Sequence, residues 1–304
     1  MSLINWYPGH IAKAQNTLKE QLKLIDFVLE LVDARLPQGS RFDVTNTLLG
    51  NKPRVLVFTK GDMADARRMN AWVAHYRKAG MAAVSLNAQT GQGLPGLKTL
   101  LQKQGEVVRA RMVARGRLPR ASRVMVVGLP NVGKSSLINK LVNKRRVKIG
   151  DKPGVTRNVS WIRLGSNLEL MDTPGIIPPK LDDQDLALAL AMIGAVSTEA
   201  YDPIVIVPEV ITILNREAPH IMAAFPDQSL EGIARQRGAM GPGGAPDVER
   251  AARQFMYDLR TGALGKLTLD APPVQFDALE EITDELDEVP LGIVADVPAE
   301  DVAE

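Results

Sequence analysis

The residues best suited to chemistry lie in one short stretch, residues 128–136, which reads GLPNVGKSS. This stretch matches the phosphate-loop pattern G-x-x-x-x-G-K-[ST], in which glycines let successive backbone N–H groups approach phosphate oxygens. In such a loop the lysine, here Lys134, reaches the β- and γ-phosphates of a nucleotide, and the Ser135 hydroxyl binds Mg²⁺. We therefore predict a nucleotide-binding loop rather than a turn without a ligand, with contacts from Asn131, Val132, Gly133, Lys134, Ser135 and Ser136.

A second group of residues has the spacing of a sensor for the terminal phosphate. In LMDTPG, Asp172 follows an apolar run and is suited to bind Mg²⁺ through water, while the Gly175 N–H can approach the phosphate. Thr156 in KPGVTRN offers a second hydroxyl to Mg²⁺. A D-T-P-G sequence alone usually forms an ordinary turn, but after a phosphate loop it favours a switch. We expect the loop around Thr156 to become ordered with a triphosphate and to be released after hydrolysis.

Two loops earlier in the chain have residues that could recognise a base. Residues 55–62, VLVFTKGD, read as a buried strand and a polar loop, in which the Asp62 carboxylate can accept hydrogen bonds from guanine N1–H and its 2-amino group. The aliphatic stem of Lys60 would cover the ring, and the Ala88 N–H could donate to guanine O6. Either loop alone would be read as a surface turn, but together with a phosphate loop they predict guanine binding by Thr59, Lys60, Gly61, Asp62, Asn87 and Ala88.

The elements that must position these loops follow an alternating pattern. Residues 27–37 predict a buried strand that is closed by a polar turn and Pro37, and short apolar runs predict further strands at residues 55–58, 82–86 and 123–128. Amphipathic patterns predict helices at 11–25, 64–79 and 94–113. Strands that alternate with helices indicate a parallel sheet covered on both faces. Residues 160–172 read as an antiparallel hairpin with its turn at 165–167. We therefore predict an α/β fold, a mostly parallel sheet with one antiparallel hairpin and helices on both faces.

The rest of the chain divides by composition. We predict a nucleotide-binding domain over residues 1–179, a small all-helical domain over 180–272, and an acidic, disordered tail over 273–304. The net charge is +2, and the 12 acidic residues after Lys266 have no basic residue among them, so residues 1–266 carry +14. Such a basic body suits a polyanion such as nucleic acid, although charge alone is equally compatible with a role in solubility.

Composition also excludes several classes of protein. The chain has no cysteine, so disulfides and thiolate metal sites are absent, as is common in a reducing cytosol. No apolar run approaches the roughly 18 residues needed for a membrane span. The first ten residues, MSLINWYPGH, lack the layout of a signal peptide. We expect a cytoplasmic protein that is monomeric and binds neither membranes nor DNA.

The order of these motifs resembles that of one family. Base loops come first, and the phosphate loop and switch residues follow, as in circularly permuted GTPases of the YlqF type, the ribosome biogenesis GTPase A family. The resemblance extends from WYPGHIAKA and VDARLP to FMYDLRTGALGKLTLD, and leaves out only the acidic tail. It implies a permuted P-loop GTPase fold, with GTP and GDP as substrate and product. Because strand ends rather than chain order place loops at the edge of a sheet, permutation would leave the site intact.

The resemblance also implies how hydrolysis is assisted. Ile176 stands where many small GTPases have a water-orienting glutamine, so intrinsic turnover should be slow. Asn131 matches the asparagine of potassium-stimulated GTPases, and His10 matches a histidine thought to approach the nucleotide on the ribosome; the alternatives are an ordinary loop asparagine and an exposed or capping histidine. Lys134 and Thr156 complete the expected catalytic set. Thr59, which replaces the common asparagine, is expected to remove one brace to the phosphate loop.

The resemblance implies that the partner is the large ribosomal subunit during late assembly. Basic residues concentrate at residues 103–123 and 140–157, with Arg250, Arg253, Arg260 and Lys266 as a further stripe. Such surfaces bind phosphates with little sequence preference, and the absence of an RNP-type aromatic motif favours recognition of folded RNA by its shape. Two alternatives remain: a G-protein switch that acts on another RNA or a protein, and a metabolic P-loop enzyme such as a kinase, for which no acceptor site is evident.

Overall fold

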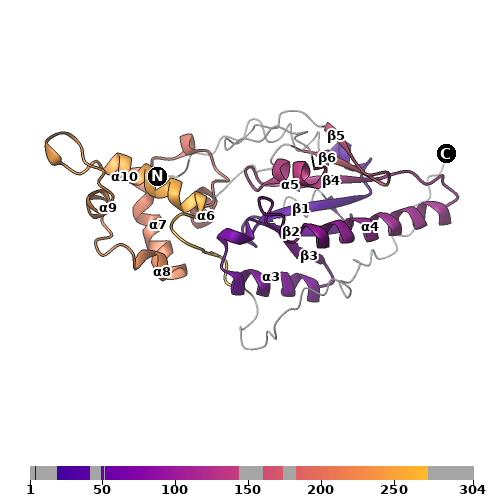
Figure 1. The fold of residues 1–304 in the computed structure, drawn as a ribbon, viewed down its shortest axis with the longest axis horizontal. Coiled ribbons are helices and arrows are strands. Elements are labelled where there is room, and N and C mark those ends of the chain that lie inside the picture. The colour runs from indigo at the N-terminus through magenta and orange to yellow at the C-terminus, as the bar shows by residue number, and fades with distance from the viewer. Residues whose placement is uncertain are drawn as a thin grey trace.

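The computed structural model of the chain describes residue 4 and residues 19–41, 49–50, 52–143, 160–173 and 183–272 (Figure 1). A six-stranded sheet and its helices form one part of the molecule, and a group of short helices lies beyond one end of the strands. Most of the predicted helix at residues 11–25, and all of the predicted acidic tail at residues 273–304, lie outside the described residues. Among the described helices, none is both long and apolar enough to cross a membrane.

The sheet has the strand order β3-β2-β1-β4-β6-β5. The pairs β2–β3, β1–β2, β1–β4 and β4–β6 are parallel, and the pair β5–β6 is antiparallel. This arrangement confirms the predicted α/β fold with a mostly parallel sheet and one hairpin. The strands are β1 (Phe27–Asp33), β2 (Arg54–Thr59), β3 (Ala82–Ser85), β4 (Ser122–Gly128), β5 (Ser160–Leu164) and β6 (Leu168–Asp172).

The central strands leave no face for water. β1 reads FVLELVD, and all seven of its residues are buried. A nearly continuous apolar run of this kind is typical of a parallel strand that is covered on both faces. Glu30 is the polar exception in the middle of β1, and its carboxylate lies 3.0 Å from Arg41 Nε and 3.7 Å from Arg54 Nη1. The buried charge is therefore paired within the fold.

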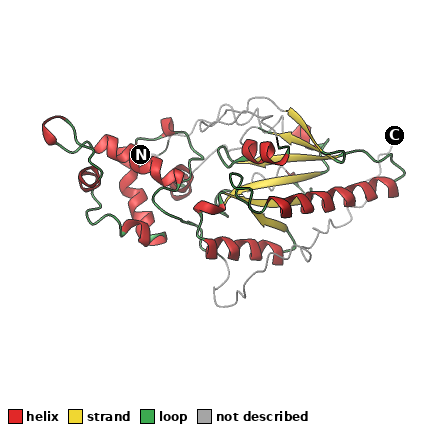
Figure 2. Ribbon diagram, in the orientation of Figure 1, coloured by secondary structure: helices red, strands yellow, loops and turns green. Residues whose placement is uncertain are grey.

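Helices cover the two faces of the sheet (Figure 2). On one face, α4 (Leu94–Ala114) and α5 (Lys134–Leu141) bury leucine and isoleucine side chains in the same hydrophobic cluster as Leu29 and Val126. On the other face, α3 (Ala66–Lys78) packs Trp72 and Tyr76 with residues of β2. Because β1, β2, β3, β4 and β6 run parallel, their carboxyl ends lie at the same edge of the sheet.

The helical part follows the sheet in sequence. Aspartate or serine residues cap four of its helices: Asp183, Asp202, Ser229 and Asp247 each accept a hydrogen bond from a backbone N–H of the first turn. Such capping satisfies N–H groups that have no partner within the helix. The helices are α6 (Gln184–Met192), α7 (Pro203–Glu217), α8 (Pro219–Met222), α9 (Leu230–Gln236) and α10 (Val248–Thr261), with the short 3₁₀ turns η2 (Thr198–Ala200) and η3 (Pro242–Gly244) between them.

After α10 the chain returns to the sheet-containing part as an extended segment, residues 267–270, drawn in yellow in Figure 1. Backbone bonds join Leu267 N to Met63 O at 3.0 Å and Leu269 N to Arg35 O at 2.7 Å. The Asp270 carboxylate accepts hydrogen bonds from the N–H groups of Gln38 and Gly39. The helical part is therefore attached at the edge of the sheet where the strands end.

Candidate nucleotide-binding site

The phosphate loop connects the end of β4 to the start of α5. Gly128 has φ of 152°, and a Cβ atom there would lie 2.5 Å from Leu31 O, so only glycine fits where the loop leaves the strand. Gly133 precedes α5 with φ of 102°, and the first bond of the helix runs from Leu137 N to Gly133 O. The N–H groups of the first turn, at Lys134, Ser135 and Ser136, have no partner within the helix, which makes this terminus suited to an anion.

Lys134 is buried beneath this loop. Its Nζ donates to Gly128 O at 3.0 Å and to Leu129 O at 2.7 Å. Burial lowers the pKa of Lys134 to about 8, while the charge of Asp172 opposes the shift. Phosphate oxygens carry negative charge and are stronger acceptors than these carbonyls. The ammonium group is thus already positioned next to the loop in which phosphates would lie.

Ser135 and Asp172 form a pair of oxygen ligands beside the loop. Ser135 Oγ lies 3.5 Å from Asp172 Oδ2, and Asp172 is fully buried at the end of β6. Asp172 Oδ1 is also buried, and no donor among the described residues is bonded to it. Burial raises the pKa of this carboxyl, opposed by Lys134 and by hydrogen bonds from Ser135 and Thr173. A hydroxyl and a carboxylate with an unused lone pair are the ligand types that Mg²⁺ prefers.

The first predicted base loop begins where β2 ends. Lys60 has a left-handed backbone with φ of 57°, which turns the chain into the short 3₁₀ helix η1 (Gly61–Met63). Asp62 is exposed on this turn, and among the described residues no donor is bonded to its carboxylate. The position leaves its oxygens available to the N–H groups of a base.

Thr59 contradicts one expectation from the sequence. Its Oγ1 lies 2.6 Å from Val132 O in the phosphate loop and 3.0 Å from Val32 O, both within hydrogen-bond distance. The replacement of asparagine by threonine was expected to remove a brace between the base loop and the phosphate loop. That expectation is wrong, because the shorter side chain is buried close enough to Val132 to reach the same loop.

The second predicted base loop follows β3 and is held by its own asparagine. The Asn87 side chain is buried, and its Oδ1 accepts hydrogen bonds from Gln89 N at 2.7 Å and Thr90 N at 3.1 Å. Asn87 therefore shapes the loop, and its amide oxygen is committed to the backbone. Within the part of the chain that the structure describes, the Ala88 N–H has no acceptor, so it remains free to donate to a base.

Three contacts bring the predicted loops together. Thr59 joins the first base loop to the phosphate loop, Gly61 N donates to Leu86 O at 3.4 Å to join the two base loops, and Lys140 Nζ donates to Gln89 O at 3.1 Å to join α5 to the second base loop. Residues separated by about 70 positions in the chain thus meet at one edge of the sheet. The predicted site residues His10, Thr156 and Gly175 lie outside the described residues.

A buried charge network that was not predicted from the sequence lies next to the first base loop. Asp33, at the end of β1, accepts two hydrogen bonds from the Arg35 guanidinium, each of 2.9 Å, and its Oδ2 lies 3.0 Å from Lys60 Nζ. Burial alone would raise the pKa of Asp33, but the charges and hydrogen bonds of Arg35 and Lys60 hold it far below its usual range. Burial lowers the pKa of Lys60, opposed by Asp33. The sequence signal was VDARLP, in which an acid ends a buried strand and a base follows two residues later.

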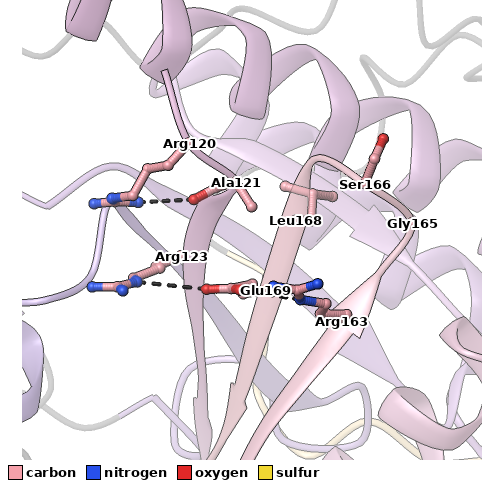
Figure 3. A pocket seen from close by; sticks show the side chains of 8 residues that line it. All are labelled: Arg120, Ala121, Arg123, Arg163, Gly165, Ser166, Leu168 and Glu169. Carbon is pink, nitrogen blue, oxygen red and sulfur yellow. Dashed lines mark hydrogen bonds and ion pairs between the residues drawn. The ribbon is translucent and has the colours of Figure 1, made fainter. Parts of the chain in front are cut away.

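A basic surface lies at the opposite end of the sheet, where β4 and β6 begin (Figure 3). Arg120, Arg123 and Arg163 line a cavity of about 310 Å³ there, together with Glu169. Arg163 is 85% exposed, and its Nε is 3.5 Å from Glu169 Oε1. Three further exposed arginines follow along the end of α4 and the segment after it. We call this set the arginine surface: Arg111, Arg115, Arg117, Arg120, Arg123 and Arg163.

The other basic groups are arranged differently from the sequence-based expectation. Arg250 and Arg253 are exposed on α10, and Lys266 is exposed after its end, as a stripe requires. Arg260 is half-buried where α10 approaches α6, since a Cβ atom on Gly194 would lie 2.9 Å from Arg260 Nε. Arg260 is therefore part of the packing between helices, and the predicted stripe is shorter by one residue. Residues 144–157 of the second basic group lie outside the described residues.

Comparison with known proteins agrees with this geometry. A family model described as 50S ribosome-binding GTPase matches residues 123–224. The match begins at β4, and the strands that carry the base loops precede it, as a permuted order requires. The GNP-bound structure of YlqF from Thermotoga maritima aligns with a TM-score of 0.63 at 27% identity, covering 86% of this chain and 100% of that one.

Two relatives are similar over almost their whole length. The ribosome biogenesis GTPase A of Bacillus cereus is 39% identical, over 92% of this chain and 98% of its own. The protein of the same name from Thermotoga maritima is 33% identical, over 90% of this chain and 97% of its own. The chain therefore belongs to the ribosome biogenesis GTPase A family and is a circularly permuted GTPase, which hydrolyses GTP.

Proposed function

We propose that this GTPase binds the large ribosomal subunit late in its assembly and leaves it after GTP hydrolysis. The observation that carries the proposal is the meeting of two base loops and a phosphate loop at one sheet edge, in a chain whose relatives are named for ribosome biogenesis. Hydrolysis at such an edge changes the charge and ligands of the switch residues, which allows binding and release to alternate. We further propose that the protein acts as a monomer in the cytoplasm and contacts neither membranes nor DNA.

The roles of the guanine-binding residues follow from their positions. The Asp62 carboxylate accepts from N1–H and the 2-amino group of guanine, and the Ala88 N–H donates to O6. Lys60 covers the ring with its aliphatic stem, while its ammonium is held by Asp33. Thr59 and Gly61 contribute to guanine binding by holding the loops in place. Thr59 joins the first base loop to the phosphate loop, and Gly61 joins it to the second base loop. Asn87 maintains the shape of the second loop.

The phosphate side has a donor set that fits Mg²⁺. Ser135 Oγ would bind the ion directly. The Asp172 carboxylate, whose Oδ1 has no donor within the described part of the chain, would bind through water. When bound, Mg²⁺ neutralises charge that develops on the phosphates. The Lys134 ammonium adds a second positive charge, and the backbone of residues 131–136 surrounds the phosphates. Thr156 and Gly175 are proposed to complete the set.

We also propose that K⁺ and His10 assist hydrolysis, because Ile176 cannot orient a water molecule. The Asn131 side chain donates its Nδ2 to Gly194 O at 2.9 Å, so a potassium ion would have to be coordinated by the amide oxygen, Oδ1. Turnover measured in potassium and then in sodium tests this role. Equal rates in the two salts would contradict it, and unchanged ribosome-stimulated turnover in His10→Ala would contradict the role of His10.

The proposed division of labour follows the proposed domains. Residues 1–179 bind and hydrolyse GTP, residues 180–272 contact the ribosome, and the acidic residues 273–304 form a tail. The arginine surface and the exposed Arg250 and Arg253 supply positive charge for ribosomal RNA. Such contacts bind the phosphate backbone of a folded RNA and become weaker as salt is raised.

Sedimentation of the protein with ribosomal particles tests the proposed partner. With a non-hydrolysable GTP analogue, we expect the protein to migrate with large-subunit particles, and with GDP we expect it to remain at the top of the gradient. Addition of large subunits should also raise GTP turnover. If analogue-dependent migration is seen instead with another RNA or protein, the chain is a switch that acts on that partner.

Replacement of Asp62 tests the base site separately. Asp62→Asn removes the charged acceptor, and because hydrogen bonds to charged groups contribute about 1.5–3 kcal/mol, GTP affinity should fall roughly 10- to 100-fold. ITP lacks the 2-amino group, so its affinity should fall less, and the preference for GTP over ITP should shrink. Calorimetry with both nucleotides measures this ratio. A preference equal to that of the unsubstituted protein would remove Asp62 from the base site.

A further inference from the structure

The C-terminal turn of α6 accepts hydrogen bonds from both halves of the nucleotide site. Arg35 Nη2, beside the first base loop, donates to Ile193 O at 2.9 Å. Asn131 Nδ2, in the phosphate loop, donates to Gly194 O at 2.9 Å. These acceptors are consecutive carbonyls of one turn, which ends in a left-handed glycine with φ of 78°. One turn of the helical part is thus bonded to residues that lie about 96 positions apart in the sequence (Arg35 and Asn131).

Arg35 extends this connection to a second helix. Its Nη1 donates to Arg260 O of α10 at 2.9 Å, so one guanidinium joins the ends of α6 and α10. The Arg35 side chain is fully buried, and the Asp33 carboxylate holds it by two parallel hydrogen bonds. The same carboxylate lies 3.0 Å from Lys60 Nζ. The path from base loop to helical part therefore consists of Lys60, Asp33, Arg35 and two backbone carbonyls.

We propose that Asp33, Arg35 and Asn131 are positioning residues that join the two nucleotide loops to the ends of α6 and α10, so that nucleotide binding and docking of the helical part stabilise each other. The coupling acts through side chains on the base side and the phosphate side, and is additional to the direct chain connection that leaves β6. It rests on the proposed placement of guanine beside Lys60 and Asp62.

The network of Lys60, Asp33 and Arg35 can transmit a movement of the first base loop to the helical part because it is buried. A charge that has been removed from water needs all of its partners, so Asp33 cannot shift without moving both Lys60 and Arg35. The planar guanidinium likewise cannot rotate to follow one carbonyl without losing the carboxylate or the other carbonyl. A nucleotide that orders Lys60 and the phosphate loop therefore favours the docked arrangement. By thermodynamic reciprocity, the docked helical part must favour the nucleotide to the same extent.

Hydrogen exchange of the full-length protein measures this coupling without any substitution. We expect GDP to slow exchange in residues 186–196 and 250–264 by roughly tenfold, a size typical of coupled sites. The described residues of these segments place no side chain in the predicted base or phosphate contacts, so protection there reports docking rather than direct shielding. Equal exchange with and without GDP would overturn the proposal.

Arg35→Lys tests the path with a variant that keeps the buried positive charge. Lysine cannot bind the Asp33 carboxylate and two carbonyls in the same geometry, because it lacks the planar fork of donors. We expect GDP affinity to fall roughly tenfold and the GDP-dependent protection of residues 250–264 to be lost. The preference for GTP over ITP should stay unchanged, since Asp62 is intact. Retention of full GDP-dependent protection in this variant would contradict the proposal.

Arg68→Lys is the matched control. Arg68 also joins the two parts of the molecule through an ion pair and a carbonyl, with Nη1 3.3 Å from Glu217 Oε2 and 2.7 Å from Thr268 O. It contacts neither Asp33 nor Lys60 in the described structure. We expect GDP affinity and GDP-dependent protection to remain in this variant. Equal losses in Arg68→Lys and Arg35→Lys would overturn the proposed path, because any weakened interface would then produce the effect.

The test also separates this proposal from the base-site assignment. If Asp62→Asn leaves the GTP-to-ITP preference unchanged, the base is not bound where we propose. If that preference shrinks as expected but Arg35→Lys retains the GDP-dependent protection, the base site stands and only the coupling is wrong.

Discussion

The two ends of the sheet are both rich in charge and use it in opposite ways. At the end where the parallel strands finish, Asp33 and Arg35 are 1% and 0% exposed and are joined by two hydrogen bonds of 2.9 Å. At the other end, Arg163 is 85% exposed, and its Nε lies 3.5 Å from Glu169. The first pair is enclosed by segments from three parts of the chain, whereas the second faces solvent.

This difference shows how burial decides what a charge can do. Buried ions lose their hydration and must be paired completely, which fixes the geometry of every group around them. Exposed arginines remain hydrated and gain little from each pair, so they stay available to an external polyanion. The groups at the end that is proposed to bind a nucleotide are thus held in one arrangement by buried hydrogen bonds. The arginine surface instead combines paired residues, such as Arg120 with Asp26 at 2.7 Å, with exposed arginines such as Arg163.

The largest effect is expected from breaking the buried pair. Asp33→Asn leaves Arg35 without its carboxylate, and loss of one partner of a buried ion pair costs about 3–5 kcal/mol of unfolding free energy at neutral pH. Denaturant titration of the two proteins measures the difference. As a control at the other end, Glu169→Gln should change the unfolding free energy by less than about 0.5 kcal/mol. Equal costs for the two variants would contradict the comparison.

The loss of unfolding free energy in Asp33→Asn is expected to depend on pH. Burial alone would raise the pKa of Asp33, but Arg35 and Lys60 lower it far below its ordinary value of 3.8. A carboxyl with a lowered pKa in the folded state stabilises the fold fully above the ordinary value, and this stabilisation is lost as pH falls below it. The cost of Asp33→Asn should therefore be greatest near neutral pH and shrink on acidification below about pH 4.

A smaller effect is expected from the arginine surface. The double substitution of Arg115 and Arg117 by glutamine removes two exposed charges, and RNA affinity at low salt should fall roughly tenfold. The slope of log affinity against log salt should decrease by roughly 1.4–1.8, because each phosphate contact contributes about 0.7–0.9. Filter binding over a range of salt concentrations measures both quantities. GDP affinity serves as the control, and an equal loss there would show that the two ends are not independent.

The smallest effect is expected from a substitution at the edge of the sheet that is proposed to bind the nucleotide. Thr59→Val keeps the shape of the side chain and removes the hydroxyl that lies 2.6 Å from Val132 O. A single hydrogen bond of this kind contributes about 1 kcal/mol, so GDP affinity should fall about fivefold. Calorimetry measures this change, with Thr99→Val as a control at an exposed hydroxyl on α4. If both variants bind GDP as tightly as the unsubstituted protein, Thr59 is not a brace.

The sequence predicted the sheet and its loops because both depend on local patterns. Apolar runs of four to seven residues end at the loops that carry Lys60, Ala88 and Lys134, and parallel strands bring such ends to one edge. The hairpin was also predictable, since its turn residues lie between two short apolar runs. The site could be predicted although the base loops precede the phosphate loop in the sequence, because the loops need only lie at the same edge of the sheet.

The contacts between distant segments were not predictable in this way. Arg35 binds carbonyls 158 and 225 positions later in the chain, and no local pattern links them. The asparagine-to-threonine replacement was misjudged because the distance from Thr59 to Val132 depends on how closely β2 and β4 flank β1. In the helical part, α8 and α9 have only four and seven residues, too few to give a clear period.

The position of β1 in the sheet has a consequence for how the chain is made. β1 lies between β2 and β4, and the residues of β4 with which it pairs come 97 positions later in the chain. A ribosome that synthesises this protein therefore releases β1, β2 and β3 while one edge of a largely apolar strand still lacks its neighbour. Unpaired strand edges are templates for association with other chains. Until β4 has been synthesised, the nascent segment that contains β1, β2 and β3 must itself be protected from aggregation.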